Sequence, residues 1–364
     1  MEFPHLLWEE GTAYDFFISL EILHNPADFG LRCAWSAGMR ARLPAADREI
    51  LETSQLLFNV PLHWIYSLPE PKDAATILWS LRQIPPAERL PVLALSPNQP
   101  KPIIAEMLKS VMDRGTWNDK DRKLIQTVYV PCDKKGKPLT PEEQKKLLDC
   151  WANSEEFGER YLKAIQSFQE VFFAEEERYI QPALDQALSN AKELAEKMSP
   201  VDLIEEVTQG LRFPELNDRE IVLAPSYWST PLLYYEKINT DRKLFLFGAR
   251  PSDASLVHGE AIPDLLIRAL KAFTCSTRLR ILQYLSQDPL TPAQLARRLR
   301  LRPPTITHHL KTLRMAGLVQ ITKTNDVEAK FYATRSKAVA STFESLKSFL
   351  EKNNTETIQN ILEL

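Results

Sequence analysis

The stretch that decides the fold reads Thr277-Arg278-Leu279-Arg280-Ile281-Leu282, then Thr291-Pro292-Ala293-Gln294-Leu295-Ala296, then Thr305-Ile306-Thr307-His308-His309-Leu310-Lys311-Thr312-Leu313-Arg314, and ends in Ala316-Gly317-Leu318-Val319. Its apolar residues recur at the spacing of helix faces. Thr291 before Pro292 is typical of a helix N-terminus, and Gly317 is typical of a helix end. These signals predict a helix-turn-helix whose second helix covers 303–316.

Two strands and a final helix are predicted to follow. Residues 318–323 and 330–334 are expected to pair as a hairpin across Asn325-Asp326, which would add a wing at 318–334. The helix predicted from Ser336 onward has an apolar stripe that consists of Val339, Phe343, Leu346, Phe349 and Leu350. This stripe needs a partner. A second copy of the chain is the natural one, because two-fold DNA half-sites match a two-fold protein.

The helix predicted at 303–316 has two different faces at 100° per residue. One face carries Ile306, His309, Leu310 and Leu313, and the opposite face carries Pro304, Thr307, His308 and Lys311. The first face suits a protein core. The hydroxyl, imidazole and ammonium groups of the second can reach base edges and phosphates in a major groove. We therefore assign His308 to the DNA side and His309 mainly to the core.

Arg302 occupies the cap position of this helix, where a neutral or acidic residue is usual. A cation beside the positive end of a helix is locally unfavourable, and a docked phosphate would remove the conflict. We expect Arg302 to bind the DNA backbone. The candidate DNA-binding residues are Arg302, Pro304, Thr305, Thr307, His308, Lys311 and Arg314, together with Lys323 and Lys330 on the wing, where Arg335 adds positive charge.

Charge is distributed unevenly along the chain. Residues 262–336 carry 13 of its 45 Lys and Arg residues but only 4 of its 48 Asp and Glu residues, and the remainder is net acidic. A basic module attached to an acidic body is the pattern expected of a nucleic-acid-binding domain joined to a domain that does not bind nucleic acid.

The residues quoted above resemble the ArsR/SmtB family of bacterial winged-helix repressors. The resemblance is carried by 277–282, by the Thr-His-His-Leu-Lys core at 307–311, and by the segment from Leu313 to Val319, and it covers about a fifth of the chain. It implies a homodimer joined by helices at about 262–274 and 337–364. It also implies repression through operator DNA that a signal relieves.

The chain departs from the metal-sensing members of that family. Their cysteine pair would fall near 290–294, where no cysteine occurs, and nothing after His309 is His or Cys. We therefore expect no metal site and no cofactor. The long N-terminal extension resembles the upstream region of uncharacterised long ArsR-type regulators, so we expect the signal to enter through this body.

The fold class predicted for the whole chain is mainly α. A helical body at 1–210, a small antiparallel β connector at 211–258 and a winged helix-turn-helix with a dimerisation helix at 259–364 are the expected parts. Proline-separated short helices are predicted at 45–58, 73–83 and 102–113. Glu175-Glu176-Glu177 is interpreted as a solvated helix face.

Three functions of the body remain open. It is a sensor whose aromatic pocket holds a small-molecule effector, a platform for protein interaction or dimerisation, or an enzyme domain fused to a DNA-binding module. The candidate ligand residues are Trp35, His63, Trp64, Tyr66 and Trp79, with Tyr227 and Trp228 as further candidates. No phosphate-binding, dinucleotide-binding, metalloprotease or nucleophile-elbow motif occurs, so we do not expect an enzyme.

The remaining composition fits a cytoplasmic protein. No run of about 18 apolar residues predicts a membrane span, and the N-terminal residues lack the pattern of a signal peptide. Four scattered cysteines form no pair and suit a reducing compartment. The expected partners are double-stranded operator DNA, a second copy of the chain and an effector, and no membrane.

Overall fold

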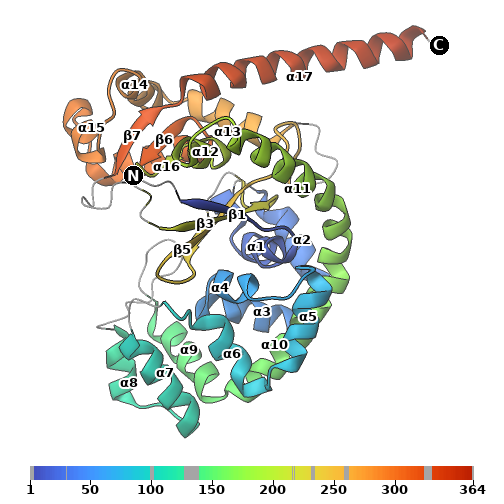
Figure 1. Cartoon of the computed structure of the whole chain (residues 1–364), viewed down its shortest axis with the longest axis vertical. Helices are drawn as coiled ribbons and strands as arrows, with labels where there is room; N and C mark the ends of the chain where they lie inside the picture. The colour runs from blue at the N-terminus through green and yellow to red at the C-terminus, as the bar shows by residue number, and fades with distance from the viewer. Residues whose placement is uncertain are drawn as a thin grey trace. The chain divides into compact units, whose positions relative to one another are not determined.

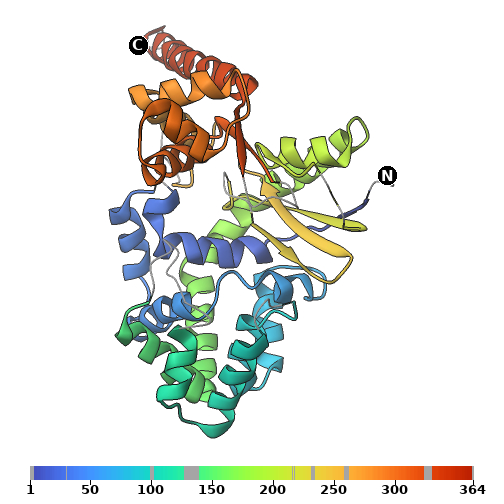
Figure 2. The same ribbon diagram turned by 90° about the vertical axis from the view of Figure 1, so that its left-hand side faces the viewer.

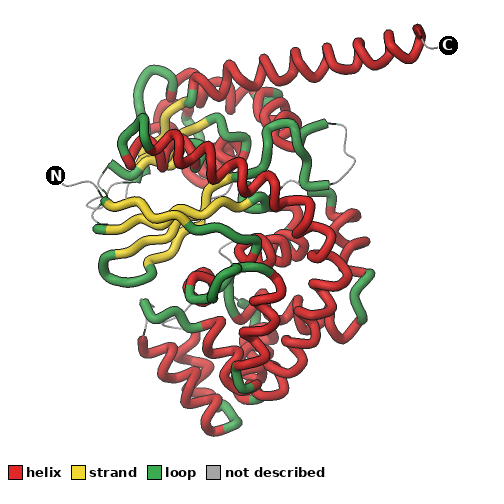
Figure 3. Tube along the Cα trace, turned by 45° about the vertical axis from the view of Figure 1, so that its right-hand side comes forward, coloured by secondary structure: helices red, strands yellow, loops and turns green. Residues whose placement is uncertain are grey.

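The computed structural model describes residues 4–29, 31–98, 102–126, 139–214, 216, 218–230, 234–257, 262–323 and 330–362, with the side chains of the last helix described through Glu351. Helices dominate, and the strands fall into two small sheets (Figure 3). The mainly α fold class is therefore confirmed. The chain divides into two compact units: a helical unit of 10–182 with 235–244, and a second unit of 1–9, 183–234 and 245–364.

Short helices separated by proline turns build the helical unit. They are α1 (Ala13–His24), η1 (Pro26–Phe29), α2 (Cys33–Ala41), α3 (Ala45–Leu57), α4 (Leu62–Tyr66), α5 (Ala74–Gln83), α6 (Pro86–Ala94), α7 (Pro102–Arg114), α8 (Asp119–Leu124), α9 (Pro141–Ala152), α10 (Ser154–Phe168), η3 (Gln169–Phe173) and the first part of α11 (Ala174–Ala195). The helices predicted at 45–58, 73–83 and 102–113 agree with α3, α5 and α7 to within one residue at the ends.

Helix α1 is buried along almost its whole length and forms the centre of this unit. The Phe16 ring contacts the edges of Phe168 and Phe173, with centroids 5.3 and 4.9 Å apart. Close to this core, the Glu177 carboxylate accepts hydrogen bonds from the Thr12 hydroxyl and from the Ala74 amide. Glu176 is buried as well. The interpretation of the three glutamates as a solvated face is therefore wrong for Glu176 and Glu177, because α11 turns these two side chains inward.

Helices α6 and α10 pack at very short range. A Cβ atom at Gly158 of α10 would lie 2.0 Å from the carbonyl oxygen of Pro86. The buried Arg89 guanidinium of α6 also joins the two helices, because its Nη1 donates a hydrogen bond to the Gly158 carbonyl at 3.0 Å. Only glycine allows two helix backbones to come this close.

The second unit contains a small sheet with the strand order β1-β3-β5-β4. Its strands are β1 (His5–Trp8), β3 (Glu220–Ser226), β4 (Tyr234–Lys237) and β5 (Arg242–Gly248), and the boundary between the two units passes through the last two. The β1 strand pairs with β3 in parallel, His5 opposite Glu220. The sequence predicts a purely antiparallel β connector within 211–258, and this prediction does not include β1. The strand could not be predicted because β1 lies far from β3 in the sequence and only tertiary folding brings the two together.

The C-terminal residues form the predicted winged helix-turn-helix (Figures 1 and 2). Its elements are α13 (Asp264–Phe273), α14 (Ser276–Leu285), α15 (Pro292–Leu299), α16 (Pro303–Met315), β6 (Val319–Thr322), β7 (Phe331–Thr334) and α17 (Ser336–Leu362). Thr291 and Gln294 form a reciprocal capping box at the start of α15. Apolar residues from α14, α15, α16 and β6 make one core. The predicted Asn325-Asp326 turn lies outside the described residues.

A third strand joins the wing from an earlier part of the chain. Helix α12 (Pro200–Val207) leads into β2 (Leu211–Arg212), which pairs in parallel with β6. The Ile321 amide donates to the Gly210 carbonyl at 2.7 Å. The wing sheet therefore has the order β2-β6-β7. The division into 1–210, 211–258 and 259–364 differs from the observed units, because β1 and β2 place residues from the predicted body and connector in the same unit as the winged helix.

Candidate nucleic-acid interface

Helix α16 presents the two faces that the sequence predicts. Ile306, Leu310 and Leu313 are buried in the winged-helix core. On the other side, the exposed side chains are those of Pro304, Thr305, Thr307, His308 and Lys311. The Thr307 hydroxyl donates to the Pro303 carbonyl at 3.1 Å, so its oxygen can still accept a hydrogen bond. This face offers hydroxyl, imidazole and ammonium groups on one rigid element, as a major-groove helix does.

The N-terminal end of α16 carries positive charge. Arg302 is the N-cap residue, is exposed, and makes no side-chain cap hydrogen bond. Arg300, the C-cap of α15, is also exposed and adopts a left-handed conformation with φ of 54°. The turn between the two helices therefore carries two exposed arginines, whose positive charge favours a phosphate there. The sequence prediction of DNA-binding residues does not include Arg300, although its position between the two predicted helices could have indicated it.

Arg314 does not belong to the DNA face, contrary to the prediction. Its guanidinium donates to the carbonyls of Thr208 and Gln209 at 2.9 and 3.0 Å. Burial, and to a smaller extent the positive charge of Arg335, lower the pKa of Arg314 to about 10. The residue therefore ties α16 to the end of α12. Helical periodicity alone places Arg314 at the flank of the exposed face, but it carries no information about the distant segment that contains Thr208 and Gln209.

The wing residues divide in a similar way. Lys330 is exposed, whereas the Lys323 ammonium lies 6.0 Å from the centre of the Phe213 ring. Arg335 donates to the Gly317 carbonyl at 2.9 Å, and burial lowers the pKa of its guanidinium. Arg335 thus links the end of β7 to the end of α16 through this hydrogen bond, and the prediction that it adds charge to the wing surface is wrong.

His309 lies at the edge of the core, next to the DNA face. Its ring centroid is 5.9 Å from that of His308, and its Nδ1 is buried without a hydrogen-bond partner among the described residues. Burial lowers the pKa of His309 below its ordinary value of 6.5, and the charges of Arg278 and His308 lower this pKa further. The neutral imidazole is therefore the form that the folded protein favours.

We expect this histidine to make stability depend on pH. Its pKa is lower in the folded than in the unfolded chain, so the unfolded chain binds more protons between the two values. The free energy of unfolding should fall as pH drops below about 6.5. The variant His309→Gln should lose this slope in urea unfolding, whereas His308→Gln should keep most of it, because burial is the larger cause. Equal slopes for wild type and His309→Gln would contradict the assignment.

Arg302 gives a second prediction. If its guanidinium contacts one backbone phosphate, Arg302→Ala should weaken binding to all DNA sequences by a similar factor. It should also reduce the slope of log affinity against log salt concentration by about 1. Fluorescence anisotropy over a range of salt concentrations measures both. Lys347→Ala on α17 removes one exposed charge elsewhere in the same unit and is the matched control. An unchanged salt slope in Arg302→Ala would show that Arg302 does not contact DNA.

The candidate ligand residues of the helical unit have separate partners. The Trp64 ring packs edge-on against Phe17, at 6.0 Å. The Tyr66 hydroxyl accepts a hydrogen bond from Arg242 at 2.7 Å. The His63 ring lies 3.0 Å from the Val92 carbonyl, and its Nδ1 is 3.6 Å from the Glu236 carboxylate.

The two tryptophans that remain among the candidate ligand residues do not complete an aromatic pocket. Trp35 is partly buried on α2, and Trp79 on α5 is 56% exposed. Further along the chain, Tyr227 and Trp228 are buried in the other unit.

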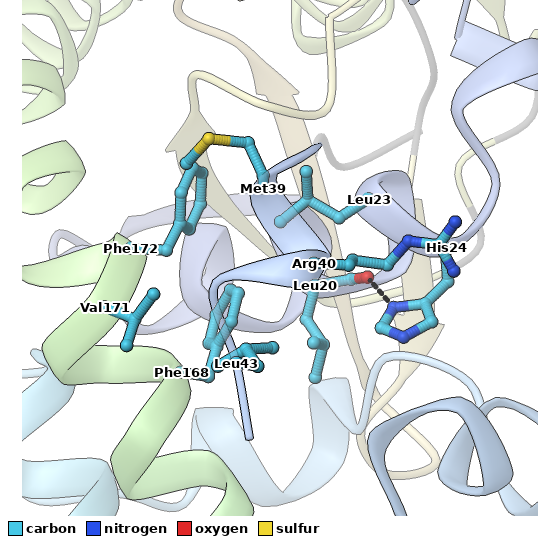
Figure 4. Close-up of a pocket in the computed structure, with 9 residues that line it drawn as sticks. All are labelled: Leu20, Leu23, His24, Met39, Arg40, Leu43, Phe168, Val171 and Phe172. Atoms are coloured by element: carbon cyan, nitrogen blue, oxygen red, sulfur yellow. Dashed lines mark hydrogen bonds between the residues drawn. The ribbon is translucent and has the colours of Figure 1, made fainter. Parts of the chain in front are cut away.

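A small hollow occurs elsewhere in the helical unit (Figure 4). It is lined by Leu20, Leu23, His24, Met39, Arg40, Leu43, Phe168, Val171 and Phe172, and contains none of the predicted ligand residues. Its empty volume is about 240 Å³ with open solvent included, whereas pockets for drug-sized ligands have about 300–1,000 Å³. The His24 ring nitrogen Nδ1 lies 2.8 Å from the Leu20 carbonyl inside the wall. The hollow therefore gives the aromatic-sensor hypothesis no support.

The described residues contain no group of three or more His, Cys, Asp or Glu side chains placed to hold a metal ion. Among the same residues, no helix has both the length and the apolar character needed to cross a membrane. Cys33, Cys150 and Cys275 are free thiols. Cys275 is the N-cap residue of α14 without a side-chain cap hydrogen bond, and the nearby backbone of Arg278 and Thr277 lowers the pKa of its thiol.

The exposed basic face of α16, the helix that precedes it and the three-stranded wing define a winged helix-turn-helix DNA-binding domain. Residues 275–320 match the family model described as "Bacterial regulatory protein, arsR family". The chain thus carries an ArsR-family helix-turn-helix regulator domain at its C-terminal end, which makes it a DNA-binding transcription regulator. None of the curated proteins matches the chain.

Proposed function

We propose that the protein is a homodimeric, cytoplasmic repressor that binds operator DNA through α16 and the wing and is released by a signal other than a metal ion. The observation that carries the proposal is the exposed face of Thr307, His308 and Lys311 on α16, with Arg302 at its N-terminal end. Together with the ArsR-family match, this face supports major-groove binding. The helical unit of 10–182 with 235–244 has no catalytic role in this proposal.

The apolar side chains of α17 support a second copy of the chain as partner. Phe343 is 54% and Leu350 is 58% exposed, although Phe343 also stacks on Phe273 of α13. Exposed apolar side chains one to two turns apart on a long helix are typical of helix-to-helix association. Because α13 and α17 contact each other, both are available for a two-fold interface.

Genome-wide capture of DNA bound by the protein, followed by anisotropy on the captured fragments, tests the DNA-binding part. We expect enrichment of short sites with two-fold symmetry, and expression of the adjacent genes should rise when the protein is deleted. Random recovery of genomic DNA would contradict the proposal. A fall in expression after deletion would instead identify an activator.

Light scattering of the purified protein tests the dimer. We expect the wild type at twice the monomer mass and Leu350→Glu at a lower average mass, with its helical circular dichroism retained. Ser348→Glu, at an exposed position on the opposite face of the same helix, is the control and should remain dimeric. A monomeric wild type would rule out this interface.

A further inference from the structure

Two buried arginines lie in the second unit, outside the DNA-binding face. Arg250 follows β5, and Arg268 lies on α13. The Arg250 side chain has no exposed surface. Arg268 is only partly buried as a residue, but none of its three guanidinium nitrogens reaches solvent. Arginine is rarely buried in this way without a partner that accepts its hydrogen bonds.

Arg250 has an incomplete set of partners. Its Nη2 donates to the Thr230 carbonyl at 3.0 Å, and its guanidinium carbon lies 6.0 Å from the centre of the Tyr227 ring. Nη1 is 3.8 Å from the Asp264 carboxylate, which itself accepts a hydrogen bond from the Leu256 amide at 2.8 Å. Nε and Nη1 of Arg250 have no hydrogen-bond acceptor among the described residues.

Arg268 has even fewer hydrogen-bond partners than Arg250. All three of its guanidinium nitrogens are without a hydrogen-bond acceptor in the described part of the chain, and so is the buried hydroxyl of Thr230. Burial, and to a smaller extent the charge of Arg250, lower the pKa of Arg268 to about 10. Within the described residues, Asp264 is the one carboxylate whose charge acts on both guanidinium groups, so one positive charge has no counter-charge there. Such an arrangement is costly in a protein interior unless another anion completes it.

We propose that Arg250 and Arg268 bind the oxyanion group of a small acidic effector, a carboxylate or a phosphate. Planar guanidinium groups bind both oxyanions through paired hydrogen bonds, and Arg is better suited to this task than Lys. The effector role rests on the proposed regulator function, whereas anion binding itself does not. Tyr227, a candidate ligand residue from the sequence, lies beside Arg250 and would border this site.

The position of Arg268 on α13 gives the bound anion a route to the DNA-binding surface. Helix α13 contacts both α16 and α17. Its residue Ala272 is part of the same core as Ile306 and Leu310 of the recognition helix. An anion that completes the charge around Arg268 would therefore act on the helix that supports both DNA binding and the proposed dimer.

Thermal unfolding of the full-length protein in chloride, acetate, sulfate and phosphate at matched ionic strength tests the inference. Because sulfate and phosphate stabilise most proteins by exclusion from their surface, the readout is the difference between wild type and Arg268→Met. We expect phosphate, acetate or both to raise the wild-type midpoint by about 2–4 °C more than that of the variant. Acetate and phosphate separate a carboxylate ligand from a phosphate ligand. Arg280→Met, at an exposed position on α14, should respond as the wild type does.

The stability of Arg268→Met in chloride keeps the test decisive. If the arginine awaits an external anion, its replacement by a similarly sized apolar residue should leave the midpoint equal or higher. A strongly lowered midpoint of Arg268→Met, together with no anion response of the wild type, would show that a group of the protein itself neutralises Arg268 and would overturn the proposal. Equal responses of wild type and Arg268→Met would overturn it as well.

Anisotropy with a captured DNA fragment separates this inference from the proposed function. Arg268→Met should bind the fragment as the wild type does but should show no change in affinity when the stabilising anion is added. If the wild type binds no DNA but binds the anion, the regulator proposal fails and the anion site remains. If it binds DNA and no anion, the anion site fails alone.

Discussion

Replacing Thr307 and His308 together by alanine is expected to lower the affinity for captured operator DNA by about 10- to 100-fold. Both side chains are exposed on α16, on the face opposite the buried Ile306 and Leu310. Their replacement removes groups that can read base edges while leaving the core of the domain untouched. Affinity for unrelated DNA should fall much less, so the ratio of specific to non-specific affinity, measured by anisotropy, should decrease.

The control for this double variant is chosen to separate base contacts from folding. Circular dichroism and the unfolding midpoint should stay at the wild-type values, because exposed helix positions tolerate alanine. Lys347→Ala should bind specific and unrelated DNA as the wild type does. If the double variant keeps its specific affinity, α16 is not the recognition helix of this protein.

Gly158→Ala is expected to destabilise the helical unit by about 1–3 kcal/mol or more. A Cβ atom there would lie 2.0 Å from the Pro86 carbonyl oxygen and 2.8 Å from its carbonyl carbon. Both are backbone atoms that cannot swing away, so α6 and α10 would have to separate. The hydrogen bond from Arg89 to the Gly158 carbonyl would be strained at the same time. Urea unfolding followed by tryptophan fluorescence measures the loss.

Gly38→Ala is the matched control in the same unit. Gly38 lies within α2, and an added Cβ atom would meet no atom within 4 Å. Alanine favours a helix over glycine by about 0.5–1 kcal/mol, so this variant should be as stable as the wild type or slightly more stable. If both variants were equally stable, the close packing of α6 on α10 would be refuted.

The DNA-binding domain could be predicted because its signals are local. The capping box of Thr291 and Gln294, the helix end at Gly317 and the helical period of Ile306, Leu310 and Leu313 each depend on residues a few positions apart. Local geometry fixes which side of α16 is buried, so the exposed positions of Thr307, His308 and Lys311 followed as well. The same reasoning found the wing strands from their alternating pattern and their turn residues.

The structure was needed wherever a residue takes its partner from a distant segment. The helical wheel placed Arg314 beside the DNA face, but the carbonyls of Thr208 and Gln209 bind its guanidinium. Likewise, the pairing of β1 with β3, and of β2 with β6, joins segments whose sequences carry no mark of one another.

By itself, then, the sequence determined that this protein has a winged helix-turn-helix and which side of its recognition helix is free, because helix period and capping are properties of neighbouring residues. Only the tertiary structure decided which charges reach solvent. Arg314 and Arg335 bind backbone carbonyls of neighbouring segments, and the guanidinium groups of Arg250 and Arg268 are buried. Burial and ion pairing depend on what the rest of the chain places around a side chain.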